Sequence, residues 1–314
     1  MTTKVWGRAD LNETLLTRRR NGGREEQKQL LLTKRRSALT GAQDEALLAS
    51  QADVAEMLRL VICSDLRKTL ILSLKQGTRT LPGLRKKTRT NSTAVIHALR
   101  ELEKEHLTCQ DSKRNYGLTN TGNIIALQLE NFARTASAIT QLGKFWLEHD
   151  LSGIPEDALK NLGCLQNAEV LTSTATDVFN AFWTFIALVE DAKTIQGVAP
   201  VFTPDLFEAY AELAAKGTPI ELVVTSEVHE NMLELADQST VKEPLKTNFT
   251  LFVIEESPRT AFTVTDYFLM VGLFRFNGSY DYSDQLLSYS ADGIRWGQKL
   301  FDHYVRASRQ FELP

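Results

Sequence analysis

The sequence predicts a two-domain protein of mixed α and β structure, in which a group of short helices with a β-hairpin is joined by one long helix to an α/β domain. Its 314 residues are more than one typical domain needs. Apolar residues first recur at helical spacing, and strand-like and helical segments then alternate. The charge is also divided. Residues 1–120 hold 23 Lys and Arg against 13 Asp and Glu, whereas the rest of the chain holds 13 against 26.

The overall composition limits the class of protein. Hydrophobic residues make up 43% and charged residues 24%, which is ordinary for a globular protein, and no apolar run is long enough to span a membrane. Cys63, Cys109 and Cys164 are too few and too widely spaced for a disulfide scaffold or a zinc site. We therefore expect a cytoplasmic protein with no cofactor and no metal. Inert, buried thiols are favoured over a redox role for Cys63 and Cys109.

Residues 1–52 are polar, low in aromatic residues and interrupted by basic runs. This composition is typical of a disordered basic extension that adds phosphate contacts. The same composition also fits a start codon placed too far upstream.

Residues 53–120 predict three helices followed by a hairpin. The first helical pattern covers 54–77 and ends at a glycine, the second begins near Thr80, and the third follows a cap at Thr90 or Asn91. The third helix places four residues at core spacing, namely Val95, Leu99, Leu102 and His106. Two short strands, at 107–110 and 116–119, enclose a basic turn. This order is the outline of a winged helix-turn-helix.

Such a domain reads DNA with short polar side chains at the start of its third helix, and with cations that reach phosphates or guanine edges. The sequence supplies both kinds of residue on one predicted side. The residues that we expect to contact DNA are Arg85, Lys86, Lys87, Arg89, Asn91, Ser92, Thr93, His97, Arg100, Lys104, Lys113 and Arg114.

Residues 121–150 predict a long connecting helix. Apolar side chains recur there in steps of four and three, as in a coiled-coil seam. The helix either pairs with its copy in a homodimer, which would match a palindromic operator, or packs on its own C-terminal domain. The seam residues are Ile125, Leu129, Phe132, Ile139 and Trp146.

Several separated motifs carry a resemblance to a known family. "SDLRKTLILSLKQG", "STAVIHALRELEKEHL" and "YGLTNTG" come in the first half, and "FWLEHDLSGIP", "IQGVAPVF", "LAAKGTPIELVVT", "AFTVTD" and "FNGSYDYSDQLLSYSADGIRWGQKLFDHY" in the second. Together they resemble the archaeal winged-helix transcription regulators of the filamentation-regulator and methyltransferase-specific regulator group, with its methanogenesis regulatory domain. The resemblance covers residues 57 to about 308. The segment "LPGLRKK" departs from the family, whose second helix is usually more acidic and lacks proline.

Residues 151–314 predict an α/β domain with a partly parallel sheet. It resembles the phospholipase D-like domains that sense ligands in some archaeal sugar-responsive regulators. The catalytic form of that fold works through a His-x-Lys pair, which this sequence lacks, so we expect no enzyme. Ligands of open α/β sheets bind beyond the carboxyl ends of strands. The effector-pocket residues expected from that rule, and from an acidic and aromatic turn near residue 281, are Phe202, Thr225, Glu227, Thr265, Asp266 and Asp281.

The sequence thus favours a sequence-specific DNA-binding transcription regulator, homodimeric, whose C-terminal domain senses a small molecule or a partner protein. The alternative is a winged-helix module that binds protein rather than DNA. An enzyme in the C-terminal domain is a third class, and it would depend on Asp266 or Asp281.

Overall fold

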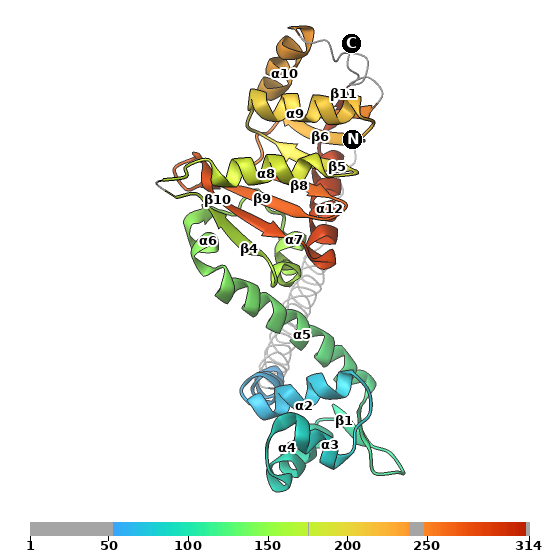
Figure 1. Cartoon of the computed structure of the whole chain (residues 1–314). Helices are drawn as coiled ribbons and strands as arrows, with labels where there is room; N and C mark the ends of the chain where they lie inside the picture. Colours follow the sequence, from blue (N-terminus) through green and yellow to red (C-terminus); the bar gives the residue numbers. More distant parts are fainter. Residues whose placement is uncertain (1–52, 175, 239–247, 312–314) are drawn as a thin grey trace, which may run out of the picture. The chain divides into compact units, whose positions relative to one another are not determined.

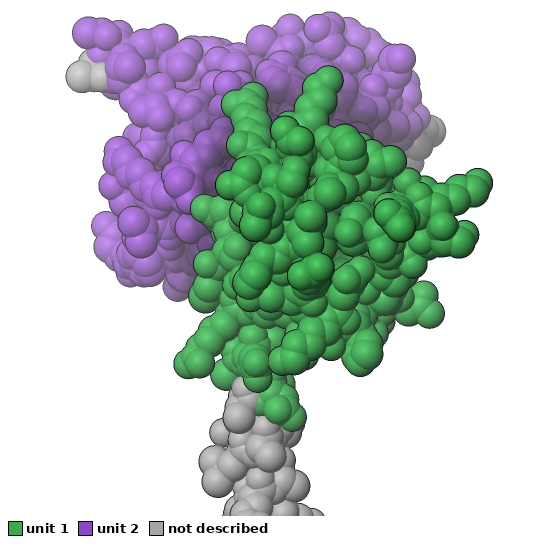
Figure 2. Space-filling model, turned by 90° about the horizontal axis from the view of Figure 1, so that it is seen from below, with its two compact units in different colours: residues 1–126 green, residues 127–314 purple. Residues whose placement is uncertain are grey.

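The computed structural model describes residues 53–174, 176–238 and 248–311, so the expected basic extension at 1–52 lies outside the described residues. The chain divides into two compact units, Met1–Ala126 and Leu127–Pro314, which Figure 2 colours green and purple. No helix in these described ranges is long and apolar enough to cross a membrane.

The described part of unit 1, from residue 53, contains short helices and one β-hairpin (Figure 1). A helical stretch at 53–62 precedes the named elements of the unit. These are α2 (Asp65–Lys75), α3 (Leu81–Thr88), α4 (Ser92–Lys104), β1 (Thr108–Gln110) and β2 (Tyr116–Leu118). The core of the unit brings together apolar side chains from all three named helices, among them the fully buried Leu70, Leu84 and Leu99.

The helices of unit 1 begin where local side chains cap them. The side chains of Ser64, Thr80 and Asn91 accept hydrogen bonds from backbone N–H groups three residues further on. Gly77, with φ of 127°, follows the end of α2. The expectation that His106 continues the core face of α4 is wrong. The helix ends before it, and His106 is exposed with φ of 56°.

A long helix, α5 (Asn120–Gln141), follows the hairpin, and a short helix, α6 (Gly143–Glu148), continues from it. The first turn of α5 lies very close to the hairpin. A Cβ atom added at Gly122 would lie 1.9 Å from the carbonyl oxygen of Leu107. Only glycine permits this approach, so it fixes the start of α5 against the hairpin.

In its described residues, unit 2 is built on a nine-stranded mixed sheet with the order β11-β7-β6-β5-β8-β9-β10-β4, and β3 pairs with β9. Strands β5, β6 and β7 run parallel to one another, while all the other pairs are antiparallel. The strands are β3 (His149–Asp150), β4 (Glu169–Thr172), β5 (Ile195–Ala199), β6 (Ile220–Thr225), β7 (Phe249–Ile254), β8 (Thr260–Thr265), β9 (Leu269–Arg275), β10 (Tyr280–Ser288) and β11 (Arg309–Phe311). The expected partly parallel sheet is therefore present.

Helices cover both faces of this sheet (Figure 1). On one face, α12 (Ala291–Arg306) packs with α6, α7 (Glu156–Lys160) and the 3-10 turn η1 (Leu162–Leu165). On the other face lie α8 (Asn180–Glu190), α9 (Pro204–Ala215) and α10 (Ser226–Gln238). Strand β6 shows the division, because Val223 belongs to the first core while Leu222 and Val224 belong to the second.

Strand β10 contains an irregularity. Tyr280 pairs with Phe274 and Gln285 with Gly272, so five steps along β10 correspond to two along β9. Three residues of β10 are therefore extra to the ladder. An odd number reverses the alternation of faces, so Gln285 lies on the same face as Tyr280 and Tyr282. The acidic and aromatic segment near residue 281, expected as a turn, is therefore part of a strand.

Candidate functional site

The surface of unit 1 carries exposed cations on α3 and the residue that ends it. Arg85, Lys86 and Lys87 lie in the last turns of α3, and Arg89 follows in a left-handed conformation with φ of 53°. All four side chains are exposed, and none forms an ion pair with a carboxylate of the described residues. An exposed, unpaired cation can approach a polyanion without first breaking an internal interaction.

Helix α4 presents a second exposed polar row. Thr93, His97, Arg100 and Lys104 recur at steps of four and three, so they lie on one side of the helix, and all four are exposed. His97 lies 3.7 Å from Glu101, and Lys104 lies at the same distance from Glu105. Arg100 has no carboxylate partner among the described residues.

The N-terminus of α4 is also polar. The Asn91 side-chain oxygen caps the helix through the N–H of Ala94 at 2.8 Å, which leaves its amide N–H groups free for another partner. Asn91 is exposed and Ser92 is half-buried. The position favours contacts with hydrogen-bond acceptors, because N–H groups point outward at a helix start.

The hairpin turn holds the last two predicted DNA contacts, Lys113 and Arg114. Asp111 shapes this turn: its carboxylate accepts the backbone N–H groups of Lys113 and Asn115, each at 2.8 Å. The hydrogen bonds from Asn115 hold the pKa of Asp111 below its usual value. Arg114 has φ of 62°, and both cationic side chains are exposed at the tip.

The hairpin is fixed to the helices by the segment before α3. Arg79 and Tyr116 exchange two backbone hydrogen bonds, at 2.9 and 2.8 Å. The Arg79 guanidinium also donates to the carbonyl of Ser73 in α2. All twelve predicted DNA contacts therefore lie on elements tied into one unit, on α3, α4, the residues between them and the hairpin.

The structure does not gather the six predicted effector residues. Phe202 follows β5 and Thr225 ends β6, two parallel strands, at one edge of the sheet, and Glu227 is in the first turn of α10. Strand β8 is antiparallel to β5, and Thr265 pairs with Ile195 at the start of β5, so Thr265 lies at the opposite edge. The carboxyl ends of strands meet at one edge of a sheet only when the strands are parallel. The expected pocket at the carboxyl ends of β5, β6 and β8 therefore does not form.

The predicted grouping of Asp266 with the carboxylates near residue 281 fails for a related reason. Asp266 follows β8, where it accepts the backbone N–H of Lys193 at 2.8 Å. Asp281 lies near the other end of β9, because β10 pairs along β9 from Phe274 to Leu269. No group of three or more His, Cys, Asp or Glu in the described part of the chain is arranged to hold a metal ion.

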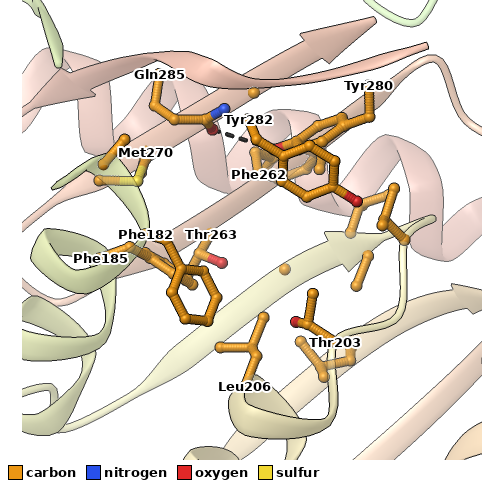
Figure 3. Close-up of a pocket in the computed structure, with 18 of the residues that line it drawn as sticks. Phe182, Phe185, Thr203, Leu206, Phe262, Thr263, Met270, Tyr280, Tyr282 and Gln285 are labelled. Carbon is orange, nitrogen blue, oxygen red and sulfur yellow. Dashed lines mark hydrogen bonds between the residues drawn. The ribbon is translucent and has the colours of Figure 1, made fainter. Parts of the chain in front are cut away.

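A cavity does lie in unit 2, between α8, α9 and the sheet (Figure 3). The space between its walls is about 730 Å³, a figure that includes the part open to solvent. The lining residues of this cavity used below are Phe182, Phe185, Thr203, Tyr210, Thr263, Gly272, Tyr280, Tyr282 and Gln285. Sequence reasoning missed it, although the motifs "GVAPVF" and "YDYSDQ" contribute some of its walls.

The polar groups of the cavity are mostly paired with one another. The hydroxyl of Tyr280 donates to the side-chain oxygen of Gln285 at 3.1 Å, as the dashed line in Figure 3 shows. The hydroxyls of Tyr210 and Thr263 lie 3.3 Å apart. Burial raises the pKa of Tyr210 to about 12, so this phenol keeps its proton at neutral pH.

Asp281 is the centre of a buried polar cluster on the opposite face of the sheet. Its carboxylate lies 3.0 Å from Nε2 of His149 and accepts a hydrogen bond from Arg275 at 2.6 Å. Burial alone would raise the pKa of Asp281, but the Ser283 backbone N–H, His149 and Arg275 outweigh it and lower that pKa.

This cluster connects the cavity to α6. Gln285, which accepts from Tyr280 in the cavity, donates its amide to the backbone carbonyl of Asp281 at 2.6 Å. Nδ1 of His149 lies 2.7 Å from the carbonyl oxygen of Phe145 in α6. A continuous set of hydrogen bonds therefore crosses the sheet, from Tyr280 to the helix that follows α5.

The predicted seam on α5 and α6 is divided in the structure. Phe132 and Ile139 are exposed, at 59% and 49%, and are free to contact another chain. Leu129 is buried, and Ile125 and Trp146 are half-buried. Exposed apolar side chains on α5 also include Ile124 and Leu127.

The cysteines differ from expectation. Cys63 and Cys109 are exposed and Cys164 is half-buried, and all three are free thiols. The expectation of buried thiols at Cys63 and Cys109 is therefore wrong.

Two family models match the chain. The N-terminal domain of the methanogenesis regulatory protein FilR1 matches residues 55–137, and the middle domain of the same protein matches residues 178–307. Among curated proteins, the methanogenesis regulatory protein FilR1 of Methanothrix harundinacea (strain 6Ac) is 25% identical over 266 residues, which are 83% of this chain and 59% of that relative. The chain thus spans less than two thirds of the length of this relative.

Solved structures with some similarity include TrmBL2, an archaeal chromatin protein described as showing a novel mode of DNA binding. It is 14% identical, with 82% of this chain and 98% of that chain covered and a TM-score of 0.37. A phospholipase D family member, Nuc from Salmonella typhimurium, is 15% identical over 46% of this chain and 99% of its own, with a TM-score of 0.35. Scores below 0.5 do not establish a common fold.

Proposed function

This chain belongs to the methanogenesis regulatory family, and we propose that it is a sequence-specific DNA-binding transcription regulator rather than an enzyme. In this proposal unit 1 is a winged helix-turn-helix that binds duplex DNA. Unit 2 senses a small molecule or a partner protein. A cytoplasmic location is part of the same proposal.

One observation carries the proposal: seven exposed Lys and Arg side chains of α3, α4 and the hairpin have no carboxylate partner among the described residues. They are Arg85, Lys86, Lys87, Arg89, Arg100, Lys113 and Arg114. Cations displace the counterions of the DNA backbone, and this release supplies much of the affinity of DNA-binding proteins. Residues 53–120 as a whole hold 13 Lys and Arg against seven Asp and Glu.

Within unit 1, α4 is the helix that we assign to the major groove. Asn91, Ser92, Thr93 and His97 are at its N-terminal half, where recognition helices contact base edges. Arg100 and Lys104, further along the same face, and the cations of α3 reach backbone phosphates. Lys113 and Arg114 at the hairpin tip take the flanking phosphates or the minor groove.

A homodimer formed along α5 belongs to the proposal as well. Phe132 and Ile139 are exposed there and would be buried by a second copy of the helix. Two-fold symmetry would then present two α4 helices to a palindromic operator.

The hydrogen bonds from Tyr280 to Phe145 supply a physical route by which unit 2 could influence α5. Regulation requires a ligand that prefers one arrangement of this route over another. The route joins the cavity to α6, and α6 follows α5 with one residue between them.

The test measures the affinity for duplex DNA from upstream of this protein's own gene at a series of salt concentrations. The wild type is compared with the double variant Arg85→Ala, Lys87→Ala. Removing two phosphate contacts should flatten the slope of log affinity against log salt by about 1.8. The matched control, Lys193→Ala with Lys216→Ala, removes two exposed cations from unit 2 and should leave the slope unchanged.

The competing reading is a winged-helix module that binds an acidic protein. That reading gains support if the wild type binds neither this DNA nor random fragments, or binds both without salt dependence. Equal slopes for the wild type and the double variant would contradict the assignment of phosphate contacts to α3.

A further inference from the structure

We propose that the cavity of unit 2 binds an uncharged, largely apolar small molecule with a flat ring and one or two polar groups. The role of this molecule as an effector depends on the proposed regulatory function, but its binding does not.

The charge of the ligand follows from the walls. None of the 19 described residues that line the cavity is charged. A charged ligand would lose its hydration there without gaining an opposite charge, and this loss is costly in an apolar site. Carboxylates, phosphates and amines are therefore disfavoured.

The number of polar groups on the ligand follows from the hydrogen bonds already formed. Tyr280 is engaged with Gln285, and the amide of Gln285 is engaged with Asp281. Tyr210 and Thr263 are engaged with each other. A polyhydroxylated ligand such as a sugar would need many more free partners than the cavity leaves.

The free hydroxyls of the cavity are those of Thr203 and Tyr282. Neither side chain has a hydrogen-bond partner in the described ranges, and Figure 3 shows both at the cavity wall. Burial raises the pKa of Tyr282, which keeps its hydroxyl protonated as a donor. Two free hydroxyls match one or two polar groups on the ligand.

The flat ring follows from the aromatic walls. Phe182 and Phe185 come from α8, and Tyr280 and Tyr282 come from β10, with ring centroids of the two tyrosines 4.8 Å apart at 82°. A Cβ atom at Gly272 would lie 1.9 Å from the Tyr280 hydroxyl oxygen, so this glycine makes room for the Tyr280 ring over β9. Aromatic side chains arranged edge to face favour a flat apolar guest.

The test uses the full chain and three probes: 1-naphthol, its charged counterpart 1-naphthoate, and maltose. Calorimetric titration should show saturable binding of 1-naphthol, at least tenfold weaker binding of 1-naphthoate, and no binding of maltose. Equal or tighter binding of 1-naphthoate, binding of maltose, or no saturable binding of 1-naphthol would overturn the proposal.

Matched variants place the binding in the cavity. Tyr282→Ala should weaken 1-naphthol binding about tenfold. Tyr289→Ala should leave the binding unchanged, because Tyr289 does not line the cavity. The two tyrosines are similarly exposed, at 54% and 53%, so neither change should unfold the protein. Equal affinities in both variants would assign the binding elsewhere.

The same preparations separate this inference from the proposed function. Naphthol binding without salt-dependent DNA binding would keep the cavity assignment and remove the regulator. DNA binding without naphthol binding would support the regulator and contradict the cavity assignment.

Discussion

Seven exposed cations of unit 1 have no carboxylate partner among the described residues, whereas in unit 2 Asp281 is buried between His149 and Arg275, and the described residues that line the cavity are all uncharged. Exposed unpaired cations attract anionic partners over a distance, so they distinguish partners by charge more than by shape. A cavity with a fixed, neutral lining selects for shape and polarity only on contact. The two units are thus suited to partners of different kinds, and each prediction below tests that difference.

The largest expected effect concerns the separation of the two cores. Leu99 in unit 1 and Leu251 in unit 2 are both fully buried. Leu99→Ala should lower the free energy of unfolding of unit 1 by about 2–5 kcal/mol, and Leu251→Ala should do the same to unit 2. Scanning calorimetry should show one transition shifted in each variant. If both transitions move together, the units do not fold independently.

The next effect concerns the buried charge. Asp281→Asn should destabilise unit 2 by about 3 kcal/mol, because His149 and Arg275 lose their carboxylate partner. Asp284 on the same strand is also buried, but its Oδ1 has no hydrogen-bond partner within the described ranges. Asp284→Asn should therefore cost under about 1 kcal/mol. Denaturant unfolding of the two variants measures the difference, and equal losses would mean that the cluster contributes nothing beyond burial.

A smaller effect is expected at the cap of α4. Asn91→Ala should cost unit 1 about 1 kcal/mol, because the N–H of Ala94 loses its acceptor. Thr93→Ala, an exposed change two residues later, should stay within about 0.5 kcal/mol. Urea unfolding monitored by circular dichroism distinguishes the two. A loss at Thr93 as large as that at Asn91 would argue against the cap.

The smallest effect is the dependence on pH. Asp281 has a lowered pKa in the folded protein, so its contribution to stability is complete above the unfolded value of 3.8. That contribution is lost as the pH falls from about 4 through the folded pKa. Between pH 5 and 3 the wild type should therefore lose more stability than Asp281→Asn. Parallel pH profiles would show that Asp281 does not titrate differently in the folded and unfolded states.

Local features of unit 1 could be predicted from sequence. Asn91 caps α4 and Gly77 follows α2, because capping depends on neighbours within a few residues. In unit 2, the strand β6 (Ile220–Thr225) coincides with a nearly continuous apolar run, which is typical of a buried parallel strand.

The cavity could not be predicted, because it depends on which strands are neighbours. Thr265 and Asp266 were assigned to the wrong edge since nothing local states that β8 runs antiparallel to β5. Strand β10 could not be predicted either, because its extra residues break the alternation of polar and apolar side chains that indicates a strand. The predicted seam on α5 contains both a buried residue, Leu129, and exposed ones, Phe132 and Ile139, and apolar spacing alone does not distinguish between them.

The irregularity in β10 has a consequence for insertions and deletions. Loss of one residue between Asp281 and Asp284 would leave two extra residues in place of three, and an even number restores the alternation of faces. Either Tyr280 and Tyr282 or Gln285 would then leave the cavity for the opposite face. Single substitutions in this segment change one contact, whereas a change in its length by one residue removes a whole wall. A change in the length of this segment by one residue should therefore damage the cavity more than any single substitution in it.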